Sequence, residues 1–70
     1  MSMEKRDKRF GFVAVELGFT TTDQLFEALK TQVKEELEGG KRQLIGQILY
    51  KKGYITSIQI DEVLLYMGIS

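Results

Sequence analysis

The chain has 70 residues and a mass of 8.0 kDa, so we expect one small domain. Lys and Arg together number 10, as do Asp and Glu, and this balance lacks the basic excess of a general nucleic-acid or membrane-surface binder. The chain contains no Cys and no His, which excludes disulfides, thiol nucleophiles, imidazole bases and zinc sites built on these residues.

The first half of the chain predicts two helices joined by a tight turn. The first helix is predicted by apolar residues with the i, i+3, i+4, i+7 spacing of one helix face: Phe10, Val13, Ala14 and Leu17. Residues 1–8, which precede this face, are expected to fray. Gly18 suits the left-handed conformation that ends helices, and Thr21 with Gln24 forms a T-x-x-Q capping box for the second helix. The second helix ends at Gly39-Gly40 and carries an apolar stripe: Leu25, Phe26, Leu29, Val33 and Leu37.

The second half repeats this pattern. Gly53 occupies the turn, and Thr56 with Gln59 forms a second capping box. The two apolar faces comprise Leu44, Ile45, Ile48 and Leu49, and then Ile60, Val63, Leu64 and Met67, with Gly68 ending the last helix. A shift of 35 positions aligns the halves with identical pairs: Gly11/Gly46, Gly18/Gly53, Thr21/Thr56, Gln24/Gln59, Glu27/Glu62 and Leu29/Leu64.

The sequence therefore predicts an all-α fold of four short helices arranged as two tandem helix-turn-helix repeats. One domain spans residues 1–70, with repeat one at about 9–32, a linker at about 33–43 and repeat two at about 44–67. The linker is charged and contains glycine, which is typical of a bend between repeats. An alternative is that Val13–Val15 and Ile48–Tyr50 are strands, although their apolar spacing lacks the period of two that strands show.

No catalytic motif, signal peptide or membrane span stands out. The charged start MSMEKRDKR leads into an amphipathic stretch, and no run reaches the roughly 18 apolar residues of a membrane-spanning helix. Acidic residues at 35, 36 and 38 have no partner base and indicate a solvated helix end rather than paired catalytic carboxylates. We therefore expect a cytoplasmic protein that is not an enzyme, with no catalytic residue, no metal, no cofactor and no membrane insertion.

One stretch resembles a known ligand-binding motif. Residues 9–32, RFGFVAVELGFTTTDQLFEALKTQ, are similar to the 24-residue motif of the MshEN-type domain, which stands at the amino terminus of bacterial type II secretion and type IV pilus assembly ATPases. Six positions match the family pattern by identity, and Phe10 and Ala14 are apolar replacements; the identities are Arg9, Gly11, Gly18, Leu25, Leu29 and Gln32. In the family, two such motifs in tandem bind cyclic di-GMP.

The resemblance implies a bacterial regulatory or adaptor domain that binds cyclic di-GMP and couples to a secretion or type IV pilus system. The ligand-binding residues that it implies are Arg9, Phe10, Gly11, Gly18, Gln32 and Gly46. Arg9 could bond a guanine edge or stack on the base, Gly11 would let the main chain approach the ligand, and Gln32 offers both a donor and an acceptor.

Other interpretations of these residues stay open. Arg9 could be a solvated residue at a helix start, and Gln32 an exposed residue in mid-helix. Gly11 and Gly46 could mark close helix packing where no side chain fits, because glycine in a helix otherwise costs on the order of 1 kcal/mol relative to alanine.

The second half departs from the family pattern at its polar positions. Leu44 stands in place of the arginine and Met67 in place of the glutamine, while Arg42 lies two residues too early. Either nucleotide binding is weak or lost, leaving a protein-protein interaction module, or a homodimer brings two first repeats together around one symmetric ligand.

Apolar residues outside the main stripes favour a protein partner, either a second copy of the chain or a secretion or pilus component. These residues are Phe12, Val15, Tyr50, Leu65 and Tyr66. The helix-turn-helix pattern also permits a DNA-binding interpretation, but the helix that would read DNA, SIQIDEVLLYM, is acidic and apolar, so we expect no DNA partner.

Overall fold

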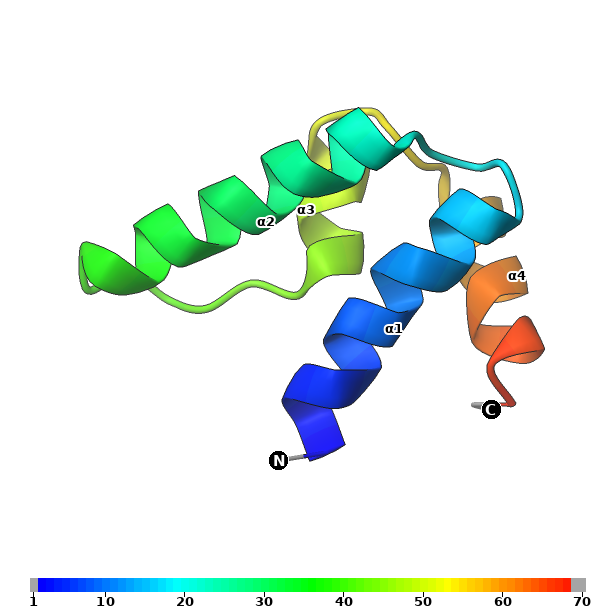
Figure 1. Ribbon diagram of the computed structural model, residues 1–70, viewed down its shortest axis with the longest axis horizontal. Helices are drawn as coiled ribbons and strands as arrows, with labels where there is room; N and C mark the ends of the chain where they lie inside the picture. The colour runs from blue at the N-terminus through cyan, green and yellow to red at the C-terminus, as the bar shows by residue number, and fades with distance from the viewer. Residues whose placement is uncertain (1, 69–70) are drawn as a thin grey trace.

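A computed structural model describes residues 2–68, with side chains from Arg6 onward. It contains α1 (Ser2–Glu16), α2 (Thr22–Leu37), α3 (Ile45–Lys51) and α4 (Ser57–Tyr66), arranged as in Figure 1. The prediction of an all-helical fold is confirmed over residues 2–68, which contain no strand, so the alternative of strands at Val13–Val15 and Ile48–Tyr50 is wrong. None of the helices in this range is both long enough and apolar enough to cross a bilayer.

The predicted caps form as expected. The hydroxyl of Thr21 accepts a hydrogen bond from the Gln24 N–H at 3.1 Å, while the Gln24 side chain accepts one from the Thr21 N–H at 3.0 Å. Thr56 and Gln59 make the same two contacts at the same distances. Gly18 and Gly53 both end their helices at φ 79°, in the left-handed region that favours glycine.

The core forms where α1 crosses α3 and α4 while α2 packs on α3. Burial of apolar surface in this core is the main stabilising term for a domain of this size. The buried apolar residues are Phe10, Val13, Ala14, Leu25, Ala28, Ile45, Ile48, Leu49, Ile55 and Val63.

Three expectations about the helices need correction. Of residues 1–8, which were expected to fray, Met1 lies outside the described residues and the rest are helical from Ser2, with Asp7 anchoring this part of α1 to the start of α3 through a contact described below. The predicted stripe of α2 is only partly buried, since Phe26, Val33 and Leu37 are exposed. Figure 1 shows the reason: the C-terminal end of α2 and the connection after it extend away from the other helices. Leu44 is also exposed and precedes α3 as its N-cap residue.

Gly11 and Gly46 lie at the crossing of α1 and α3, where no side chain fits. A Cβ atom on Gly11 would lie 2.5 Å from Leu25 Cδ1 and 3.4 Å from Ile45 Cγ2. A Cβ atom on Gly46 would lie 3.0 Å from the ring of Phe10. Both glycines therefore allow the helices to approach closely, which is the packing interpretation left open by the sequence.

Replacing Gly11 with alanine tests this interpretation, because close packing and ligand approach predict opposite changes in the free energy of unfolding. We expect Gly11→Ala to lower the free energy of unfolding by about 1–3 kcal/mol, because the new methyl group overpacks the buried Leu25 side chain. If the position only served ligand approach, alanine would instead raise the stability by about 1 kcal/mol through its better helix propensity. Urea unfolding followed by circular dichroism distinguishes the two signs.

A polar contact joins α2 to the turn between α3 and α4. The Tyr54 hydroxyl donates to Glu27 Oε1 at 3.0 Å, and Lys52 Nζ lies 3.5 Å from Glu27 Oε2. The hydrogen bond to Glu27 is the main cause that raises the pKa of Tyr54 above its ordinary value of 10.0, with desolvation and the negative charge of Glu27 adding to it.

The raised pKa of Tyr54 predicts a loss of stability in alkali. Because the folded-state pKa exceeds the unfolded-state value of 10.0, the stabilisation is complete below that pH and is lost as the pH rises through the raised pKa. We expect the free energy of unfolding to fall more steeply with rising pH in the natural chain than in Tyr54→Phe. Urea unfolding at a series of alkaline pH values measures both slopes, and equal slopes would refute this role.

Candidate functional site

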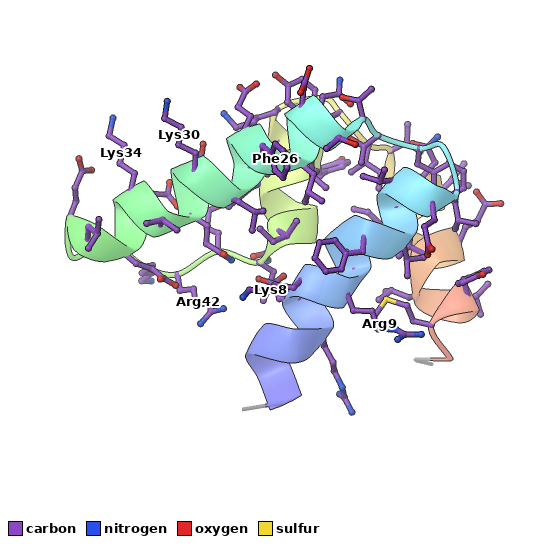
Figure 2. All side chains as sticks on the ribbon, viewed as in Figure 1. Lys8, Arg9, Phe26, Lys30, Lys34 and Arg42 are labelled. Atoms are coloured by element: carbon purple, nitrogen blue, oxygen red, sulfur yellow. The ribbon has the colours of Figure 1, made fainter. Side chains whose placement is uncertain are left out.

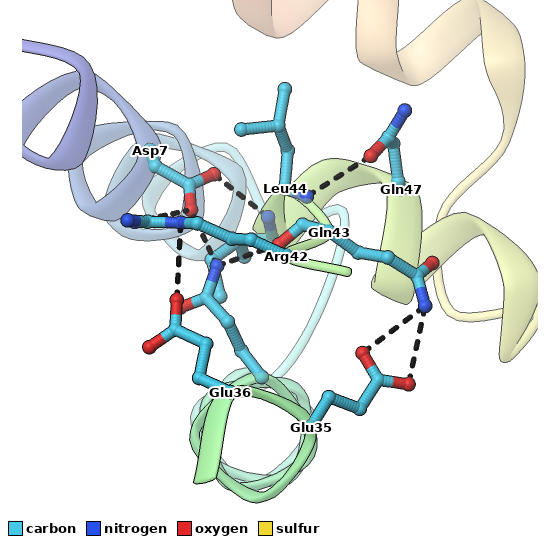
Figure 3. Close-up of polar contacts among 9 residues, drawn as sticks. Asp7, Glu35, Glu36, Arg42, Gln43, Leu44 and Gln47 are labelled. Carbon is cyan, nitrogen blue, oxygen red and sulfur yellow. Dashed lines mark hydrogen bonds and ion pairs between the residues drawn. The ribbon is translucent and has the colours of Figure 1, made fainter. Parts of the chain in front are cut away.

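The most buried polar contacts of the described residues surround the carboxylate of Asp7, on α1. Its Oδ1 accepts a hydrogen bond of 2.7 Å from the backbone N–H of Ile45, the first residue of α3. Its Oδ2 accepts one of 2.7 Å from the Gln32 side chain of α2 and lies 3.9 Å from the Arg42 guanidinium. Asp7 is only 6% exposed, so these donors replace the water that a buried carboxylate loses. Figure 3 shows how this carboxylate joins α1, α2 and α3.

Asp7 also supplies a cap that α3 lacks locally. The N-cap residue of α3 is Leu44, whose side chain has no hydrogen-bond acceptor. The Leu44 N–H is satisfied by the Gln47 side chain at 3.0 Å, whereas the Ile45 N–H depends on Asp7. A negative charge beside the first turn of a helix also interacts favourably with the helix dipole.

Gln32 is part of this structural cluster. Its amide nitrogen donates both hydrogens, one to Asp7 at 2.7 Å and the other to the backbone oxygen of Gln43 at 2.8 Å. The residue is 8% exposed, so the interpretation of Gln32 as an exposed mid-helix residue is wrong. Its donors hold the connection after α2 against α1, and they are not free to contact a base in this conformation.

A second set of contacts fixes the projecting end of α2. Arg42 Nε lies 3.3 Å from Glu36 Oε2, and the Gln43 side-chain nitrogen donates to both oxygens of Glu35 at 3.1 and 3.2 Å. Figure 3 shows these contacts, and Figure 1 shows the connection running back along α2 towards α3. The end of α2 is therefore held in a defined position although its apolar residues are exposed.

The implied ligand-binding residues do not surround one open site. Phe10, Gly11 and Gly46 are buried at the crossing of α1 and α3, and Gln32 is buried against Asp7. Gly18 is exposed at the turn after α1. Arg9 is exposed, and it lines a shallow hollow with Phe12, on α1, and Tyr66, at the end of α4. Figure 2 shows Arg9 on α1 near the C-terminal end of α4.

An apolar groove of about 320 Å³ lies between α1, α3 and α4. Apolar side chains form its walls, together with the backbone at Gly46, and polar atoms enter mainly from Arg6, Asp7 and Gln47. The apolar wall residues are Phe10, Leu44, Ile60, Leu64 and Met67. Its volume lies at the lower end of the range for small-molecule sites, and its shape also suits an apolar side chain of a partner.

The surface of the molecule is rich in large apolar side chains, among which Leu44 also lines the groove. Of the off-stripe residues expected to be exposed, Val15 is half-buried and the other four are exposed. The exposed large apolar residues are Phe12, Phe26, Val33, Leu37, Leu44, Tyr50, Ile58, Leu65 and Tyr66. Among the side chains that the structure describes, from Arg6 onward, no three Asp or Glu residues gather in a way that could hold a metal ion.

Comparison of the chain with protein-family models, with curated proteins and with solved structures finds no match. The resemblance of residues 9–32 to the MshEN-type motif stays a prediction.

The sequence interpretation missed Asp7 and Arg42 as structural residues. Asp7 lies in a mixed-charge stretch that reads as a solvated tail, and Arg42 lies in the linker. The sequence contains two features that point to these residues. First, α3 begins at Leu44 and Ile45, whose side chains cannot cap a helix. Second, Asp7 and Arg42 have opposite charges and lie 35 positions apart, at equivalent places in the two halves. A missing local cap calls for an acceptor from another part of the chain.

Proposed function

We propose that this chain is a helical protein-interaction module that acts through its exposed apolar surface. The observation that carries this proposal is the number of large apolar side chains that a fold this small leaves outside its core. Some of these side chains gather, since Phe12 and Tyr66 line one hollow and Val33 and Leu37 another, and aromatic residues are of the type enriched at interface centres.

The contacts of the residues implied in ligand binding favour a protein-interaction role over a nucleotide-binding role. Two of the three residues with ligand-type chemistry, Gly11 and Gln32, serve internal packing and internal hydrogen bonds. A base that accepted a hydrogen bond from the Gln32 amide nitrogen would have to displace Asp7 or Gln43 and leave a buried group unsatisfied, which costs about 1–3 kcal/mol.

Affinity capture with a surface variant tests the interaction role. The tagged natural chain and the double variant Phe12→Ser, Tyr66→Ser are used as baits in an extract of the source cells. Both changes lie on exposed positions, so we expect the fold to survive, which circular dichroism checks. The proposal predicts a protein retained by the natural chain and lost from the variant. No retained protein, or equal retention by these two baits and by a third bait carrying Leu37→Ser, would count against it.

A second candidate function is the binding of cyclic di-GMP in a regulatory or adaptor role. The observation that favours it is the position of Arg9 beside Phe12 and Tyr66, since an arginine and aromatic rings can stack on a guanine base. Its coupling to a secretion or type IV pilus system rests on the resemblance alone. Calorimetric titration with cyclic di-GMP tests it: binding that Arg9→Ala abolishes supports this function, and no heat at millimolar ligand refutes it.

We also propose that the two halves are tandem helix-turn-helix repeats. The equal φ values of Gly18 and Gly53 and the matching capping boxes support this arrangement. The crossing of α1 and α3 adds a reciprocal contact, because Gly11 faces Ile45 while Gly46 faces Phe10, and these residues occupy equivalent positions. We further propose a cytoplasmic location, which a composition without cysteine supports.

A further inference from the structure

The groove between α1, α3 and α4 carries one uncompensated charge. Of the two charged side chains that line it, Asp7 accepts hydrogen bonds from the Ile45 N–H and Gln32 and pairs with Arg42. Arg6 is exposed and makes no ion pair or hydrogen bond with any other residue whose side chain the structure describes. The groove therefore suits an apolar side chain that is accompanied by a carboxylate.

The projecting end of α2 of this same chain carries an exposed apolar side chain next to a carboxylate. Leu37 is 82% exposed, the highest value among the exposed large apolar residues, and Val33 lies one turn before it. Glu38, next to Leu37, is exposed, and its carboxylate has no bonding partner among residues 6–68. Figure 1 shows this end of α2 pointing away from the body of the same molecule.

The end of α2 is also held in place before any partner arrives. The ion pair of Arg42 with Glu36 and the hydrogen bonds of Gln43 with Glu35 fix the connection that follows Leu37. A fixed apolar tip loses less conformational freedom on binding than a mobile one. The chain thus offers a pre-formed apolar projection and an apolar groove on separate parts of one molecule.

We propose that the groove binds a second copy of this chain, with Leu37 of one protomer between Phe10, Leu64 and Met67 of its partner and Glu38 beside Arg6. This inference rests on the proposed interaction role and names the chain as its own partner. The contact joins two different surfaces, so it closes into a dimer only if each tip reaches the groove of the other protomer. The area of one such contact is small, so we expect weak association.

Sedimentation equilibrium tests the proposal at protein concentrations up to about 1 mM, where an association of this strength is measurable. We expect the natural chain to associate and Leu37→Ser to weaken the association by roughly tenfold or more. Leu65→Ser is the matched control, because this leucine is 72% exposed on α4 and does not line the groove. Equal weakening by the two variants, or a monomer at every concentration, would overturn the proposal.

Charge reversal tests the polar half of the contact. Arg6→Glu and Glu38→Arg should each weaken association, while the double variant should restore it because the pair is re-formed with opposite signs. Both residues are exposed, so neither change threatens the fold. A double variant as weak as the single ones would exclude the pairing.

A spin label locates the contact directly. The chain has no Cys, so Lys41→Cys carries a single nitroxide near the tip of α2. This spin-labelled chain is mixed with an isotope-labelled chain that carries no spin label. We expect the nuclear magnetic resonance signals of Leu64 and Met67, which line the groove of the isotope-labelled chain, to lose intensity. A loss of signal intensity along α2 instead would indicate that the exposed faces of two α2 helices pair, and it would contradict the proposal. A strict monomer that still captures another protein would overturn this inference and leave the interaction role intact.

Discussion

The variant Asp7→Asn is expected to lower the free energy of unfolding by about 3 kcal/mol, because a buried carboxylate is replaced by a group that cannot satisfy the same donors. Asparagine has one acceptor oxygen, and its amide hydrogens would face either the Ile45 N–H or the Gln32 amide. In a domain of this size, such a loss lowers the melting temperature by roughly 15 °C. Thermal unfolding followed by circular dichroism measures it.

Asp61→Asn provides the matched control for Asp7→Asn. Asp61 is exposed on α4 and makes no hydrogen bond or ion pair with the buried cluster, so we expect its replacement to change stability by less than about 0.5 kcal/mol. Equal effects at the two positions would show that Asp7 is solvated and does not join the three helices.

Phe10→Ala is expected to have an effect of similar size. The ring is buried at the crossing of α1 and α3, against the backbone of Gly46. Removing it costs the transfer free energy of the ring and leaves a cavity, together about 3 kcal/mol or more. Urea unfolding of Phe10→Ala measures the loss.

The contact between Phe10 and Gly46 can be isolated with a double-mutant cycle. Gly46→Ala alone should destabilise the chain, because the new methyl group would lie 3.0 Å from the ring. In the Phe10→Ala background the same change should become neutral or stabilising by up to about 1 kcal/mol, since the ring is gone and alanine favours the helix. Additive effects of the two changes on the free energy of unfolding would show that the Phe10 ring does not require glycine at position 46.

The local features of the fold were predictable from the sequence because they depend on neighbouring residues. The capping boxes at Thr21 and Thr56 are completed three residues later, and the turns at Gly18 and Gly53 need only a residue that tolerates a positive φ. The apolar periodicity of residues 10–17 placed the inward face of α1 correctly.

The features that depend on distant residues were not predictable in the same way. Nothing near Gln32 in the chain shows that Asp7 and the oxygen of Gln43 take both of its amide hydrogens. The exposure of Leu37 follows from the end of α2 passing beyond its neighbours, which helical periodicity does not reveal. The resemblance in residues 9–32 therefore picked out positions that this fold uses for packing, leaving Arg9 as the exposed one with ligand-type chemistry.

Gln32 connects elements of the fold through both of its amide hydrogens, which Asp7 and the backbone oxygen of Gln43 accept. Nuclear magnetic resonance of the isotope-labelled chain observes the two side-chain amide protons of this residue directly. We predict that both exchange slowly with water and that neither signal moves when cyclic di-GMP is added. Rapid exchange together with a ligand-dependent shift of these two signals would show that the Gln32 amide is open to a ligand and does not connect the helices.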